Sequence, residues 1–100
     1  MAKILIIDDE PFILESLEMF LAEKGHDIFK AADGTEGLSQ YERHRPVVVI
    51  LDIRLPDMSG FDILETLNQK TPATKVIMIT AYHDMETAIR SMKHGAFDYI

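Results

Sequence analysis

The fold is decided by the stretch Val47-Val48-Val49-Ile50-Leu51-Asp52. Its first five residues form a continuous apolar run, rich in β-branched side chains, which is typical of a strand buried on both faces of a parallel sheet. Two runs of the same kind flank it along the chain, at residues 4–7 and 76–79. The alternating run Asp27–Ala31 predicts an edge strand, and Ala96–Ile100 predicts the entry to a fifth strand.

Segments with helical spacing lie between these runs. The segment Pro11–Lys24 begins with a proline, which suits a first helical turn, and Gly25 follows as a stop signal. Its inward face is expected to carry Ile13, Leu14, Leu17, Phe20 and Leu21. A weaker helix is predicted over residues 35–43, with Leu38 and Tyr41 turned inward.

Two more helices are predicted in the second half of the chain. Ser59 and Asp62 have the spacing of a capping box, ahead of a helix that ends near Lys70. Asp84 can cap a fourth helix, which Gly95 closes. The apolar residues of that helix are Ala88, Ile89 and Met92.

The alternation of strands and helices defines the fold class as α/β. Short connections between parallel strands require right-handed crossovers, so we expect one domain over residues 1–100, an open parallel sheet with helices on both faces. In such sheets the binding crevice lies at the carboxyl ends of the strands, near the point where the strand order reverses. The residues that follow each strand are therefore the candidates for function.

The composition excludes several classes of protein. The 100 residues contain no cysteine, which excludes disulfides, thiolate nucleophiles and cysteine-based metal sites. A net charge of −7 with scattered basic residues argues against direct nucleic-acid binding. The first apolar run is too short for a signal peptide or a membrane span. We therefore expect a cytoplasmic domain that does not contact the membrane.

Oxygen-bearing side chains follow three of the predicted strands. Asp8 and Asp9 follow the first, Asp52 the third and Thr80 the fourth. Three ionised carboxylates in one crevice repel one another unless a cation lies between them, and Mg²⁺ is the ion that prefers such oxygen ligands. Each residue also has a simpler structural interpretation. A single aspartate after a strand is often a helix cap, as Asp9 could be for the first helix, and the Thr80 hydroxyl could merely satisfy a backbone group.

Four blocks of sequence, in order, resemble the receiver domains of two-component response regulators. They are residues 4–11 (Ile-Leu-Ile-Ile-Asp-Asp-Glu-Pro), residues 47–60 around Asp52, Ile79-Thr80-Ala81, and residues 95–100 (Gly-Ala-Phe-Asp-Tyr-Ile). The resemblance spans the chain and is greatest to receivers attached to enhancer-binding transcriptional activators. It implies a flavodoxin-like sheet with the strand order 2-1-3-4-5.

The resemblance also implies a chemistry for the acidic residues. Asp52 would accept a phosphoryl group from a sensor histidine kinase, in a phosphorelay that regulates transcription through an output domain or partner protein. Asp9, Asp52 and the main-chain carbonyl of Arg54 would bind Mg²⁺ directly, and Asp8 would bind it through water. These roles agree with the needs of phosphoryl transfer, which are chiefly positioning and neutralisation of charge.

Two further residues would relay the signal. Thr80 corresponds to the switch hydroxyl that bonds the phosphoryl group, and Tyr99 to the aromatic whose orientation follows it, although an aromatic residue in a strand is more often a packing residue. Ala81 corresponds to the small residue that keeps the site accessible. The module would catalyse only its own phosphorylation and dephosphorylation.

One part of the family pattern does not appear. Receivers carry a Lys-Pro pair just beyond the position of Ile100, followed by a fifth helix, so we expect a chain truncated at the start of the fifth strand. The edge of the fourth strand would then be unpaired and one face of the sheet bare near the first helix, which favours self-association.

Three alternative functions would each require a different feature of the sequence. A Mg²⁺-dependent phosphohydrolase would need a second carboxylate two residues after the nucleophile, where this chain has Arg54. A flavin-binding module would need a phosphate-binding loop rich in Ser, Thr and Gly after the first strand, where this chain has an acidic segment, residues 8–10. A degenerate receiver that acts without phosphorylation stays open, but the acidic site is intact.

Overall fold

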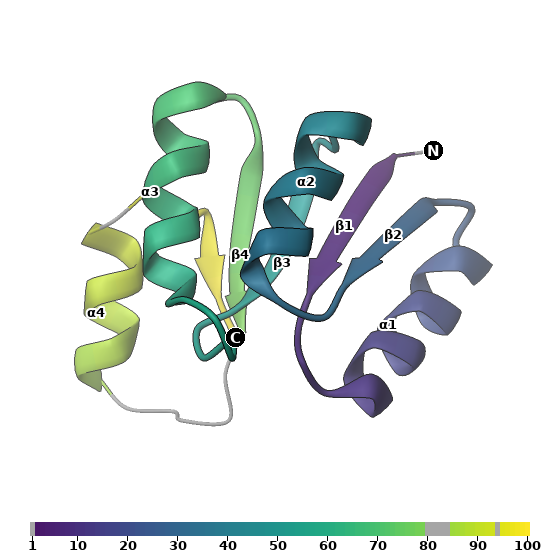
Figure 1. Cartoon of the computed structure of the whole chain (residues 1–100), viewed down its shortest axis with the longest axis horizontal. Helices are drawn as coiled ribbons and strands as arrows, with labels where there is room; N and C mark the ends of the chain where they lie inside the picture. Colours follow the sequence, from purple (N-terminus) through teal and green to yellow (C-terminus); the bar gives the residue numbers. More distant parts are fainter. Residues whose placement is uncertain (1, 80–84, 94) are drawn as a thin grey trace.

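Strands and helices alternate along the chain, as the apolar runs predict, in a computed structural model that describes residues 2–79, 85–93 and 95–100 (Figure 1). The strands are β1 (Lys3–Ile7), β2 (Asp27–Ala31), β3 (Val48–Asp52), β4 (Lys75–Ile79) and β5 (Asp98–Tyr99). The helices are α1 (Pro11–Glu23), α2 (Gly34–His44), α3 (Gly60–Lys70) and α4 (Met85–Lys93).

The sheet is parallel and has the order β2-β1-β3-β4-β5, so the expected strand order is confirmed. The order reverses beside β1, because β2 pairs with one of its edges and β3 with the other. The expectation that the edge of β4 is unpaired is wrong. Two residues of β5 pair with it, Asp98 opposite Ile77 and Tyr99 opposite Met78, and Ile100 donates a backbone hydrogen bond to the Met78 carbonyl.

The hydrophobic core lies between the sheet and the helices α2 and α3. Alternate residues of the central strands face it, because side chains of a strand point to opposite sides of the sheet in turn. From the sheet they are Leu5, Ile7, Val49, Leu51, Val76 and Met78, and from the helices Tyr41, Phe61, Ile63, Leu64 and Leu67. The Tyr41 hydroxyl is paired with the Thr74 hydroxyl at 3.2 Å, which satisfies the polar end of this buried ring. This face carries most of the buried apolar area.

The other face of the sheet is less well covered. Helix α1 contacts β1 and β2, at the β2 end of the molecule (Figure 1), and none of its residues is fully buried. The expected inward position of Phe20 is wrong, because its side chain is 57% exposed. The strand residues Ile50 and Ile77 are only half-buried, whereas the neighbouring Val49 and Val76 on the opposite face are almost fully buried. Burial on this second face is therefore complete at β1, where Ile4 and Ile6 are buried, and lower at β3 and β4.

The ends of two helices test the capping predictions. Ser59 precedes α3, and its hydroxyl accepts a hydrogen bond from the Phe61 amide, which confirms it as a cap. Asp9 does not cap α1, because Glu10 is the N-cap residue. The Glu10 side chain makes no capping hydrogen bond. Asp84 lies outside the described residues, and Ile89 and Met92 of α4 are about half exposed.

Helix α4 packs beside α3 and β5. The guanidinium of Arg90 lies over the ring of Phe61, with 4.3 Å between its central carbon and the ring centroid. No helix within the described residues has the length and apolar character needed to cross a lipid bilayer.

The difference in burial predicts a difference in stability. Leu64→Ala should lower the free energy of unfolding by about 2–5 kcal/mol, because the side chain is fully buried and its removal leaves a cavity. Phe20→Ala should change it by less than about 1 kcal/mol, because more than half of the ring is already in water. Urea unfolding of both variants measures the contrast, and equal losses would contradict the unequal burial of the two faces.

Candidate functional site

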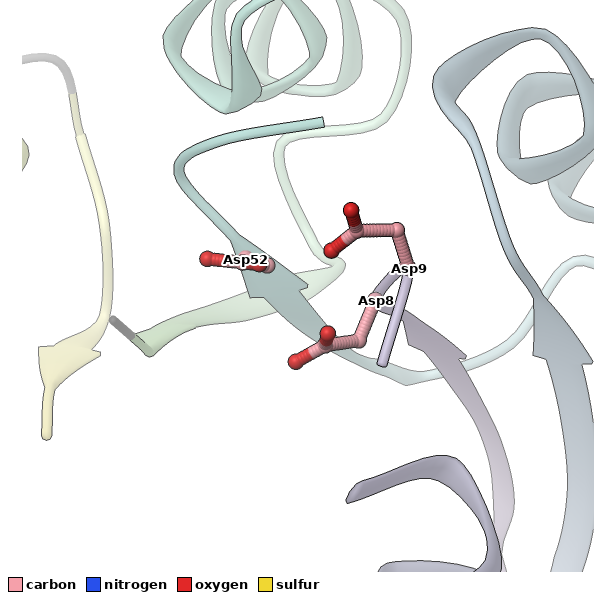
Figure 2. Close-up of side chains that lie close together, drawn as sticks. All are labelled: Asp8, Asp9 and Asp52. Carbon is pink, nitrogen blue, oxygen red and sulfur yellow. The ribbon is translucent and has the colours of Figure 1, made fainter. Parts of the chain in front are cut away.

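Three carboxylates meet at the carboxyl ends of β1 and β3. Figure 2 shows the side chains of Asp8, Asp9 and Asp52 lying close together, with Asp8 and Asp9 directly after β1 and Asp52 as the last residue of β3. One carboxylate oxygen from each lies within 4.8 Å of the others. The predicted acidic residues are therefore brought together, at the edge of the sheet where the strand order reverses.

The register of the sheet places these side chains. Ile7 pairs with Leu51, so the residues that follow these two positions leave neighbouring strands at the same level. The Asp8 amide still donates to the Ala31 carbonyl at 3.0 Å, which holds the start of the loop against β2. The Asp8 carboxylate in turn accepts a hydrogen bond from the Glu10 amide at 2.9 Å, which orients this buried side chain.

Burial and like charge make the site electrostatically unfavourable without a cation. Burial, and then the charge of Asp8, raise the pKa of Asp52 to about 6. The pKa of Asp8 is also raised, mainly by burial, even though the hydrogen bond from the Glu10 amide lowers it. Both groups therefore hold a proton more strongly than ordinary aspartates do.

The donor set fits a hard divalent ion. It consists of carboxylate oxygens on rigid strand ends, which is the ligand type that Mg²⁺ prefers. The ion pairs Lys30–Glu18, Arg45–Glu42 and Lys70–Glu42 lie away from the site, so these basic side chains do not neutralise the three aspartates. A bound cation is the direct remedy for their repulsion.

The loop after β3, residues 53–59, begins at the site. The Arg54 amide donates to a carboxylate oxygen of Asp52 at 3.3 Å, and the Gly60 amide donates to the Ile53 carbonyl at 2.8 Å. A Cβ on Gly60 would overlap the backbone carbonyl of Asp52. Only glycine fits there, which gives a physical reason for the glycine eight residues after Asp52.

The predicted switch residues are only partly tested. Thr80 and Ala81 lie outside the described residues. Ile79, the last residue of β4, pairs with Asp52. The backbone of Tyr99 forms part of β5. Their assigned roles stay predictions.

Asp57, in the middle of the loop, has a structural role that the sequence does not predict. Its carboxylate accepts hydrogen bonds from the amides of Gly34 and Thr35 at the start of α2. The partners are 23 and 22 residues away along the chain, and no local pattern signals a contact at that separation.

The chain is similar to known proteins over almost its whole length. The family model described as the response regulator receiver domain matches residues 4–100. The transcriptional regulatory protein KdpE of Mycobacterium tuberculosis is 40% identical over 100 residues, which cover 100% of this chain and 44% of the relative. The response regulator protein PilR of Pseudomonas aeruginosa is 42% identical over 98 residues, which cover 98% of this chain and 22% of the relative. The chain thus spans less than half the length of these relatives.

A solved structure shares the fold throughout. The CheY-like response regulator receiver domain protein from Methanospirillum hungatei superposes with a TM-score of 0.93 at 37% identity. The match covers 100% of this chain and 80% of that one.

The raised pKa of Asp52 predicts a pH-dependent cost to stability in the metal-free protein. Between pH values near 4 and 6 the folded state binds a proton at Asp52 that the unfolded state releases, so the stability contributed by this group falls as the pH rises through that window. Asp52→Asn removes this cost. The variant should therefore gain melting temperature over the unmodified protein at pH 8 in EDTA, and the gain should vanish near pH 4.

Asp27→Asn, at an exposed carboxylate on the edge strand, is the control, and its effect should not follow the same window. Carbon-13 NMR of the Asp52 carboxyl group tests the cause directly. Asp8→Asn should lower the Asp52 pKa but leave it above that of an ordinary aspartate, because burial is the larger cause. If Asp52→Asn and the unmodified protein differ in melting temperature by the same amount at pH 4 and at pH 8, the assignment of the raised pKa to Asp52 is wrong.

Proposed function

Because the chain belongs to the response regulator receiver family, we propose that Asp52 accepts a phosphoryl group from a sensor histidine kinase in a Mg²⁺-dependent reaction. The observation that carries this proposal is the convergence of Asp8, Asp9 and Asp52 at the strand ends. Asp52 is half-buried at the end of β3, where the strand fixes its position.

In the proposed reaction a carboxylate oxygen of Asp52 attacks the phosphorus atom of a phosphohistidine. The new O–P bond forms as the P–N bond breaks, and the bonding electron pair stays on the imidazole nitrogen, which takes up a proton. Asp52 must be ionised to attack, and a cation bound beside it would favour the ionised form. Mg²⁺, held by Asp9, Asp52 and the Arg54 carbonyl and by Asp8 through water, would neutralise charge on the transferred oxygens.

The domain then transmits the phosphorylation of Asp52 as a conformational change, and it does not turn over a substrate. We assign Thr80 as the hydroxyl that bonds the phosphoryl group and Tyr99 as the aromatic that follows it. The surface of α4 would carry the change to an output domain or partner protein. Relatives named as transcriptional regulators support a role in transcription, and we place the reaction in the cytoplasm.

The phosphoacceptor is tested by mass spectrometry after incubation with acetyl phosphate and Mg²⁺. The protein should gain a single phosphoryl group on Asp52, and Asp52→Asn should gain none, because an amide is not a nucleophile toward phosphorus. Asp62→Asn, at an exposed carboxylate of α3, should be phosphorylated normally. Normal phosphorylation of Asp52→Asn would show that the nucleophile is misassigned, and steady release of phosphate without a stable adduct would favour a phosphohydrolase.

The relay is tested separately with Thr80→Ala. This variant should still be phosphorylated on Asp52, because the nucleophile and the metal ligands are unchanged. The change in amide hydrogen exchange that phosphorylation produces in α4 should be reduced, because the hydroxyl that detects the phosphoryl group is lost. Equal exchange changes in Thr80→Ala and the unmodified protein would count against the role of Thr80.

A further inference from the structure

The carboxylate of Asp57 connects the loop after β3 to the start of α2. It accepts three hydrogen bonds, from the Gly34 amide at 2.7 Å, the Thr35 amide at 2.9 Å and the Thr35 hydroxyl at 2.7 Å. Amides at a helix N-terminus have no partner within the helix, so a carboxylate that accepts from two of them is well placed. We call this set of contacts the Asp57 clamp.

Close packing supports the same connection. A Cβ on Gly34 would overlap the side chain of Met58, the residue next to Asp57 in the loop. Met58 itself packs against the hydrophobic core. The loop therefore meets α2 through an apolar contact and three hydrogen bonds side by side.

The other end of the loop is closed beside the acidic site. Arg54 and Ser59 form an antiparallel bridge, and the Gly60 amide bonds the Ile53 carbonyl. The Arg54 amide contacts the Asp52 carboxylate. The loop is thus fixed at its base next to Asp52 and tied to α2 near its middle.

We propose that Asp57 is a positioning residue for the metal site: by anchoring residues 53–59 to α2, it holds the Arg54 peptide in the orientation that the ion requires. This inference rests on the proposed function, which assigns the Arg54 carbonyl as a ligand. Groups that orient the ligands of a metal contribute to its affinity without touching the ion.

The charge state of the clamp is constant across physiological pH. The Thr35 hydroxyl and then the Gly34 and Thr35 amides lower the pKa of Asp57 to about 2. The Asp57 carboxylate therefore stays ionised over the pH range in which Asp52 gains or loses its proton.

Helix α2 offers a matched control, because a second carboxylate caps it. Asp33 is the N-cap residue and accepts from the Glu36 amide at 2.8 Å. Asp33→Ala should destabilise α2 by removing this cap, and the hydrogen bonds from Gly34 and Thr35 to Asp57 should remain. Asp57→Ala removes both a cap of α2 and the anchor of the loop. The loss of the loop anchor is therefore the effect that distinguishes Asp57→Ala from Asp33→Ala.

The experiment measures Mg²⁺ affinity by calorimetry at pH 7.5, with MgCl₂ as the only ligand. Asp57→Ala should bind Mg²⁺ on the order of 10-fold more weakly than the unmodified protein, the loss typical of a supporting group around a metal site. Asp33→Ala should bind it normally at a lower melting temperature. Thr35→Ser, which keeps the hydroxyl donor, should bind more tightly than Thr35→Val.

Amide hydrogen exchange of the metal-free protein gives a second measurement. The Gly60 amide should exchange faster in Asp57→Ala than in Asp33→Ala, because only the first variant frees the loop. If the unmodified protein binds Mg²⁺ and Asp57→Ala binds it equally well, the positioning role is wrong and the proposed function stands. If Asp33→Ala weakens binding as much as Asp57→Ala, the effect comes from helix stability and the positioning role is again wrong. If the unmodified protein does not bind Mg²⁺, the proposed function fails, and the inference fails with it.

Discussion

The repulsion between carboxylates at the ends of adjacent parallel strands governs the site. The pairing of Ile7 with Leu51 makes β1 and β3 end at the same level, so Asp8 and Asp52 cannot separate without a change of register. A shift by one residue would turn every apolar side chain of the strand to the opposite face, which the well-buried side of the sheet does not tolerate. The burial that stabilises the sheet therefore holds like charges together. Burial and this repulsion raise the pKa values of Asp8 and Asp52.

The surrounding elements are arranged to keep this geometry. Gly60 lets the start of α3 approach the carbonyl of Asp52, and the Asp57 clamp joins the intervening loop to α2. Both helices pack on the sheet face that forms the main core, to which α3 contributes Leu64. The site is thus supported by the well-buried side of the molecule, whereas α1, on the less buried side, adds little direct support to the residues after β3. Stability and site geometry depend on the same face.

Sequence reasoning works where the signal is local or periodic. The apolar run Val47–Leu51 marks β3 to within a residue, and Ser59 marks the start of α3, because burial and capping act on neighbouring residues. Phe20 was misplaced, because a helical stripe shows which side of a helix is apolar but not how much of it the sheet covers. The role of Asp57 depends on a contact across 22 and 23 residues, which only the folded chain reveals.

Protons and divalent ions compete for the same carboxylates in this arrangement. A proton on Asp52 relieves its repulsion with Asp8, but under the proposed function it would also remove a metal ligand and the nucleophile in one step. Linkage then requires metal affinity to fall as acid raises the proton-bound fraction, with Asp52 half protonated near pH 6. Asp57 does not take part in this competition, because its hydrogen bonds keep it ionised down to about pH 2. The chain thus raises the pKa of one carboxylate and lowers that of another, and it does so by burying the first and surrounding the second with hydrogen-bond donors.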